Sequence, residues 1–186
     1  MIAGTFISQT FSLFCLGKLP NPMTTLYLIR HGIAAERGTY ADDDDRPLTQ
    51  KGIQKTEQIA QRLVELELKF DLIQTSPLVR ARQTATILHD YKLASVIETS
   101  DLLAPAGNLQ AWLNWLKLQP EEADRTLALV GHQPDLGNWA ESLVWGSSKE
   151  RLVVKKAGII GLTLPPRGSV IGRSEMFWLT PPRFLL

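Results

Sequence analysis

The stretch Leu26-Tyr27-Leu28-Ile29-Arg30-His31-Gly32 decides the fold class that we expect for this chain. Its first four residues are almost wholly apolar and rich in strand formers, which is typical of a strand covered on both faces in a parallel sheet. Arg30 and His31 therefore lie at the carboxyl end of that strand. In open α/β sheets ligands collect at such ends, where strands meet helix amino termini.

The remainder of the chain alternates between short apolar runs and amphipathic segments. We expect further strands at residues 70–74, 126–130, 158–164 and 176–179. Helices are expected after Thr49 as N-cap, after Ser76-Pro77 with the serine as N-cap, over residues 109–116 and over residues 134–144. This order predicts a three-layer α/β/α sandwich with a mostly parallel central sheet.

Length and composition are those of one globular domain. The chain has 186 residues, 44% of them hydrophobic, which is enough to bury one substantial core. Its 20 Lys and Arg balance 19 Asp and Glu, and no basic run is present, which argues against nucleic acid as a partner. The single cysteine, Cys15, excludes an internal disulfide and a thiolate zinc site, and favours a reducing, cytoplasmic setting.

The amino-terminal stretch differs from the rest of the chain. Residues 2–17 are fairly apolar, yet they are too short and too polar to span a membrane. The first basic residue, Lys18, follows this stretch instead of preceding it, which argues against a signal peptide. We expect residues 1–22 to be a poorly ordered extension and residues 23–186 to form a single domain, with Met23 as a possible true start.

Two arginines and two histidines follow the ends of predicted strands. They are Arg30 and His31 after the first strand, Arg80 beyond the second, and His132 directly after Gly131. The planar guanidinium fork suits a phosphoryl group, because it donates hydrogen bonds in pairs and stays charged. A neutral imidazole can attack phosphorus in line, and a second histidine can donate to the phosphoryl oxygens. This chemistry needs no metal and no cofactor.

Gly32 is a candidate substrate-binding residue, because a residue without Cβ lets the backbone turn sharply and brings its N–H close to an anion. Taken alone, an Arg-His pair at a strand end is more often structural than functional. The placement of this pair together with Arg80 and His132 at strand ends favours a functional role.

These segments resemble the histidine phosphatase superfamily, the phosphoglycerate mutase-like proteins. The signature of that family is an Arg-His-Gly at a strand end, a mid-chain arginine on a Ser-Pro-x-x-Arg-x-x-Gln-Thr helix and a late Gly-His. The branch most similar to this chain is that of the SixA-type phosphohistidine phosphatases. The resemblance runs from about residue 24 to Pro182 and rests on residues 26–32, 45–49, 76–85 and 129–134 and on Gly52.

The resemblance implies a role for each matching residue. His31 would be phosphorylated, Arg30 and Arg80 would bind the phosphoryl group, and His132 would complete the pocket. Arg46 would be an additional anion-binding residue at the rim.

The proton donor is the least clear part of the pattern. Superfamily members that cleave phosphoesters place an acidic residue beyond the second helix, and here Glu98 and Asp101 are nearest, with Asp101 slightly out of register. Phosphohistidine relaxes this demand, because a protonated imidazole is a good leaving group. The short interval between Arg80 and His132 leaves little room for a capping insertion, so the open pocket could admit a protein.

The sequence therefore predicts a metal-independent phosphohydrolase that works through a phosphohistidine on His31. Its expected substrate is a phosphohistidine-bearing protein of a phosphorelay, such as a histidine phosphotransfer domain. Two alternatives stay open: a broad phosphatase or mutase for small phosphoesters, and a phospho-ligand binding module that has lost turnover.

Other conspicuous residues receive structural interpretations. The run Asp42–Asp45 is expected to be solvated surface, because metal coordination needs oxygens spread in space. His89 and Arg82 are expected at structural or surface positions. Trp112, Trp115 and Trp139 lie on predicted helices, where packing against a sheet is their ordinary role.

Overall fold

The computed structural model of the chain describes residues 22–119 and 123–186. Cys15 and all but the last residue of the predicted extension 1–22 lie outside the described residues. No helix in the part of the chain that is described has both the length and the apolar character needed to cross a membrane.

A six-stranded mixed sheet forms the centre of the molecule. The strands lie in the order β3 (Ile97–Thr99), β2 (Leu72–Thr75), β4 (Arg125–Gly131), β1 (Thr24–Arg30), β5 (Ile159–Leu164) and β6 (Glu175–Thr180). The first four strands in this order pair in parallel, as predicted. The two late strands form an antiparallel hairpin on β1, so the sheet is mixed.

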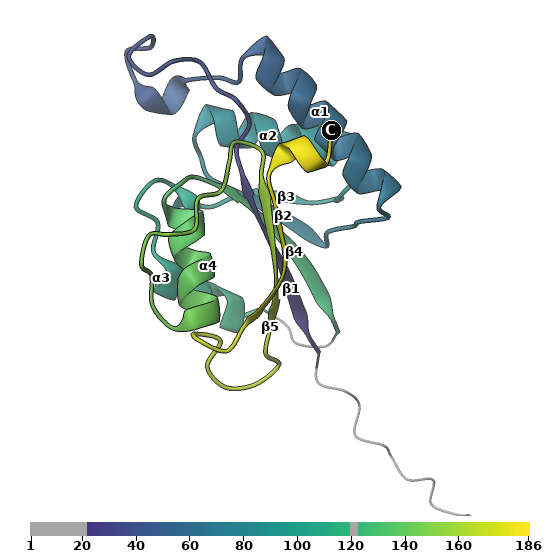
Figure 1. The fold of residues 1–186 in the computed structure, drawn as a ribbon, viewed down its shortest axis with the longest axis vertical. Coiled ribbons are helices and arrows are strands. Elements are labelled where there is room, and N and C mark those ends of the chain that lie inside the picture. Colours follow the sequence, from purple (N-terminus) through teal and green to yellow (C-terminus); the bar gives the residue numbers. More distant parts are fainter. Residues whose placement is uncertain (1–21, 120–122) are drawn as a thin grey trace, which may run out of the picture.

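Helices cover both faces of the sheet, which confirms the three-layer sandwich (Figure 1). The helices α1 (Gln50–Glu65) and α2 (Val79–Asp90) cover one face, and α3 (Leu109–Lys117) and α4 (Asp135–Trp145) cover the other. Alternate residues of β1 supply both cores: Tyr27 and Ile29 pack toward α1 and α2, and Leu26 and Leu28 pack toward α3 and α4.

The two helices on the first face begin differently. Thr49 caps α1 as predicted, because its hydroxyl oxygen accepts the Gly52 N–H at 3.0 Å. Ser76 was expected to cap α2, and this is wrong: the helix begins at Val79, with Leu78 at its N-cap position. The Ser76 hydroxyl is engaged elsewhere, since it lies 2.8 Å from the imidazole of His132.

The strand β3 was not predicted, because it is three residues long and lies at the sheet edge with Glu98 and Thr99 exposed. The expected burial of Trp112 and Trp139 is confirmed. Trp112 also donates its indole N–H to the Gln74 side-chain oxygen at 2.8 Å, which satisfies both buried polar groups.

Candidate active site

The carboxyl ends of β1 and β4 bring the two predicted histidines together. These strands pair in parallel with Arg30 opposite Gly131, so His31 and His132 follow at neighbouring strand ends. The His31 N–H donates to the Gly131 carbonyl at 3.1 Å, and the two imidazole centroids are 5.1 Å apart. Arg80 reaches the same place from the first turn of α2.

A cavity of about 600 Å³ opens at this edge of the sheet. Arg30, His31, Arg80 and His132 all line it, and we call these four residues the cradle. Twelve further residues complete the lining: Ala34, Ala35, Glu36, Arg37, Asp43, Arg46, Pro105, Ala106, Gln133, Pro134, Asp135 and Lys156.

His31 is held as a neutral imidazole with a defined tautomer. Its side chain is buried, and Nδ1 lies 2.8 Å from the Gly32 carbonyl oxygen. Because a carbonyl oxygen only accepts, Nδ1 carries the proton and Nε2 keeps its lone pair. Burial lowers the pKa of His31 to about 3, with further lowering from His132, Arg80 and Arg30. The unprotonated Nε2 is therefore available as a nucleophile at neutral pH.

His132 is likewise buried and neutral. Its Nε2 lies 2.8 Å from the Ser76 hydroxyl oxygen, which fixes the orientation of the ring. Burial, with Arg80 and Arg30 nearby, lowers the pKa of His132 to about 4. The serine expected to cap a helix therefore positions a histidine of the cradle.

The two cradle arginines retain unused hydrogen-bonding capacity. Arg30 donates from Nη1 to the Val154 carbonyl at 2.8 Å, and Arg80 donates from Nη1 to the Asp43 carbonyl at 2.7 Å. Within the described ranges, the Nε atoms of Arg30 and Arg80 are the only buried side-chain nitrogen or oxygen atoms without a hydrogen-bond partner. Burial lowers the pKa of both guanidinium groups. An anion in the cavity would offset this cost.

Asp43 is exposed, as expected for this acidic run, but it also contacts two arginines of the cavity. Its carboxylate accepts from Arg46 Nε at 2.8 Å and from Arg80 Nη2 at 3.1 Å. The hydrogen bond from Arg46, together with the charge of Arg80, lowers the pKa of Asp43. Arg46 lines the cavity as expected of a rim residue, but it also donates to the Ala35 carbonyl at 2.7 Å. Arg46 and Asp43 therefore tie the loop of residues 34–46 to the cradle.

Gly32 has a different role from the expected one. Its N–H donates to the Thr84 hydroxyl at 3.0 Å instead of facing an anion, and Gly32 does not line the cavity. A Cβ at this position would lie 2.6 Å from the Thr56 hydroxyl oxygen of α1. Close packing of the chain against α1 and α2 therefore explains the glycine.

The structure does not bring Asp101 into the site. Asp101 is exposed in a short 3-10 helix, Asp101–Leu103, and does not line the cavity, and neither does Glu98. Three acids line the cavity: Glu36 is exposed, Asp43 is bound to two arginines, and the third is Asp135, whose Oδ2 accepts the Ala106 N–H at 3.1 Å. Burial raises the pKa of Asp135. The sequence offered one signal for it, its place three residues after His132.

Lys156 is a second cavity residue that sequence reasoning missed, since it precedes β5 and no motif includes it. The described residues hold no group of three or more His, Cys, Asp or Glu arranged for a metal ion. The site as a whole combines a neutral nucleophile with guanidinium groups that can stabilise a dianion.

Known proteins resemble this chain over most of its length. The family model for the histidine phosphatase superfamily (branch 1) matches residues 26–133. An uncharacterized protein of Picosynechococcus sp. is 51% identical over 162 residues, which cover 87% of this chain and 98% of that protein. The phosphohistidine phosphatase SixA of Escherichia coli is 26% identical over 145 residues, which cover 77% of this chain and 88% of SixA.

A solved structure shows the same arrangement of elements. The protein histidine phosphatase SixA in complex with tungstate superposes with a TM-score of 0.76 at 25% identity, and the match covers 87% of this chain and 99% of that one. The predicted resemblance is thus confirmed both in sequence and in fold. On the strength of the matched residues, which include the whole cradle, this chain belongs to the histidine phosphatase superfamily.

Proposed function

We propose that this chain is a phosphohydrolase that carries the phosphoryl group on Nε2 of His31 and takes it from phosphohistidine on a protein. The observation that carries the proposal is the neutral His31, with Nε2 unprotonated, in one cavity with the buried Arg80 and the partly buried Arg30, whose buried Nε atoms have no partner. The similarity to SixA, a phosphohistidine phosphatase, supports the choice of substrate.

In the first step, Nε2 of His31 attacks phosphorus as the bond from phosphorus to the leaving nitrogen breaks. Arg30 and Arg80 bind the phosphoryl oxygens, where negative charge is concentrated in the transition state. The Ser76 hydroxyl accepts the Leu78 N–H at 3.3 Å and can donate its own proton to Nε2 of His132. In that tautomer His132 keeps its Nδ1–H as a donor for the phosphoryl group.

The proton for the leaving imidazole comes from Asp135, a cavity acid whose pKa is raised by burial, whereas the pKa of Asp43 is lowered. Asp101, the candidate from the sequence, is exposed outside the cavity. In the second step a water molecule attacks phosphorus on His31 and returns a proton to the Asp135 carboxylate. The products are the free histidine of the substrate and inorganic phosphate, and the enzyme regains its starting state.

A phosphatase or mutase for small phosphoesters is the second candidate, because the superfamily includes phosphatases and mutases and the cavity could hold such a molecule. The third candidate, a binding module without turnover, would not need a nucleophile held neutral with Nε2 unprotonated. All four cradle residues are present around one cavity, which favours an enzyme.

A substrate panel tests the proposal. The protein is incubated with a phosphohistidine peptide, a phosphoserine peptide and a sugar phosphate, and phosphate release is followed for each, with His31→Ala as control. We expect the phosphohistidine peptide to have the highest kcat/KM and the variant to be inactive. Faster turnover of the sugar phosphate would support the second candidate, and binding without release would support the third.

A further inference from the structure

The segment of residues 151–158 is pinned beside the nucleophile. The Ala157 N–H is shared between the carbonyl oxygens of Arg30 at 3.0 Å and His31 at 3.1 Å, and the Val154 carbonyl accepts from the Arg30 side chain. Ala157 has a φ of 60°, a conformation that a residue with a Cβ rarely adopts. Such strain persists where the surroundings fix the backbone, so the segment has a defined position at the cavity edge.

Elements on the far side of this segment fix it further. The Gln133 side chain donates to the Leu152 carbonyl at 2.8 Å and accepts the Val154 N–H at 3.2 Å. The buried carboxylate of Glu141 accepts the N–H groups of Lys149, Arg151 and Leu152. Hydrogen bonds to the end of β1, to Gln133 and to α4 therefore fix the backbone of this segment.

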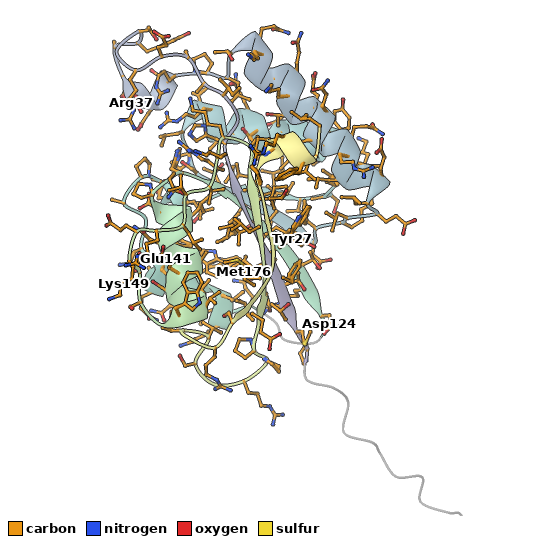
Figure 2. The ribbon with its side chains drawn as sticks, in the orientation of Figure 1. Tyr27, Arg37, Asp124, Glu141, Lys149 and Met176 are labelled. Carbon is orange, nitrogen blue, oxygen red and sulfur yellow. The ribbon has the colours of Figure 1, made fainter. Side chains whose placement is uncertain are left out.

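The fixed backbone places Lys156 in the cavity lining, whereas its neighbour Lys155 does not line the cavity. Lys156 is exposed, but partial burial of its side chain and the charges of Arg30, Arg46, Arg37 and Arg80 lower its pKa. Arg37 lines the same cavity and lies on the projecting loop of residues 34–46 (Figure 2).

The cations of the cavity exceed what one phosphoryl group uses. Asp43 pairs with Arg46 and Arg80, whereas no salt bridge within the described residues joins Arg30, Arg37 or Lys156 to a carboxylate. A bound phosphoryl group occupies Arg30 and Arg80 of the cradle. Arg37 and Lys156 then remain as like charges that repel each other and their neighbours until an anion lies between them.

We propose that Lys156 and Arg37 form a second anion subsite, which binds a carboxylate flanking the phosphohistidine on a protein substrate. The inference rests on the proposed function and specifies its substrate. A protein carboxylate suits the subsite because Arg37 is exposed on the projecting loop, where its guanidinium is accessible to side chains of a bound protein. A second phosphate on a small molecule shares this chemistry, and the experiment separates the two.

Binding of a stable phosphohistidine analogue tests the subsite without turnover. Peptides that carry a phosphoryl-triazole in place of phosphohistidine, flanked by either Asp or Asn, are measured by fluorescence anisotropy at low ionic strength. We expect the protein to bind the Asp-flanked peptide about fivefold more tightly, and Lys156→Gln to abolish this preference. The matched control Lys155→Gln should keep it. A preference that survives Lys156→Gln, or is absent in the unchanged protein, overturns the assignment of the subsite to a carboxylate.

Turnover and competition complete the design. With phosphohistidine peptides, Lys156→Gln should raise KM about fivefold for the Asp-flanked peptide and clearly less for the Asn-flanked peptide, with kcat little changed for both. Equal losses on both peptides would make Lys156 part of the phosphoryl grip and overturn the inference. If pyrophosphate competes in a Lys156-dependent way and the flanks have no effect, the second anion is a phosphate. Absence of turnover together with a retained binding preference would refute the proposed function alone.

Discussion

The cradle and the rim of the cavity are built in different ways. The cradle histidines follow two paired strands, are buried, and are oriented by a backbone carbonyl and a serine hydroxyl. The rim consists of the loop of residues 34–46 and the segment of residues 151–158, and it carries the exposed cations Arg37 and Lys156. Chemistry that needs fixed geometry lies on the sheet, and groups that can select a substrate lie on loops.

The largest difference should appear between two arginines of one helix. Arg80→Ala removes a buried cradle guanidinium and should lower kcat/KM about 100- to 1,000-fold, as loss of a transition-state donor does. Arg82→Ala removes an exposed guanidinium that does not line the cavity, and should change kcat/KM less than about twofold. Steady-state kinetics with circular dichroism as a folding check compare them. Similar losses in both variants would contradict the assignment of Arg80.

A smaller effect should follow from the residue that orients His132. Ser76→Ala leaves the imidazole in place without its hydrogen bond, so we expect kcat to fall about tenfold with little change in KM. NMR of the side-chain nitrogens should show that His132 has lost its single tautomer. An unchanged kcat together with an unchanged His132 spectrum would mean that the serine has no positioning role.

A third comparison is between a carboxylate of the cavity wall, Asp135, and one on the surface outside the cavity, Asp101. Asp135→Asn removes the proposed proton donor and should lower kcat several-fold, more for a phosphoester than for phosphohistidine, whose leaving group needs less help. Asp101→Asn should leave kcat within about twofold, because Asp101 is exposed outside the cavity. Parallel assays on both substrates test this. A larger loss from Asp101→Asn would restore the candidate chosen from sequence.

The charge state of the cradle gives a prediction that involves no change in rate. A pKa of about 3 means that His31 stays neutral as the pH falls from 7 to 5, whereas an ordinary histidine gains its proton near 6.5. Long-range nitrogen NMR of the free protein should therefore show His31 as the Nδ1–H tautomer at pH 5. A doubly protonated imidazole at pH 6 would remove the basis for a neutral nucleophile.

The same division between sheet and loops explains what could be read from the sequence. The apolar run before Arg30 and the one before Gly131 identify buried parallel strands. Because parallel strands end at the same edge of the sheet, residues that directly follow them are expected to lie together at that edge. The positions of Arg30, His31 and His132 were therefore predictable from the strands, whereas Arg80, in the first turn of α2, was assigned through the family motif. The fold class was predictable for the same reason. The antiparallel direction of β5 and β6 could be learned only from their observed pairing in the sheet.

Apart from Arg46, which the family resemblance placed at the rim, the rim was not predictable, because its residues meet through tertiary contacts without a periodic pattern. Asp43 lies in an acidic run that resembles solvated surface, and only the folded loop brings it to Arg46 and Arg80. Asp135 and Lys156 reach the cavity from a helix start and from a turn. Ser76 has the local chemistry of an N-cap, but its contact with His132 takes precedence.

Capture of the phosphorylated enzyme tests the central claim most directly. The protein is mixed with a phosphohistidine peptide, quenched within a turnover at alkaline pH, digested and mapped by mass spectrometry. The account predicts one acid-labile phosphate, on His31 at Nε2, that decays at least as fast as kcat and is absent in His31→Ala. Phosphate on another residue, or turnover by His31→Ala at the rate of the unchanged protein, would contradict it.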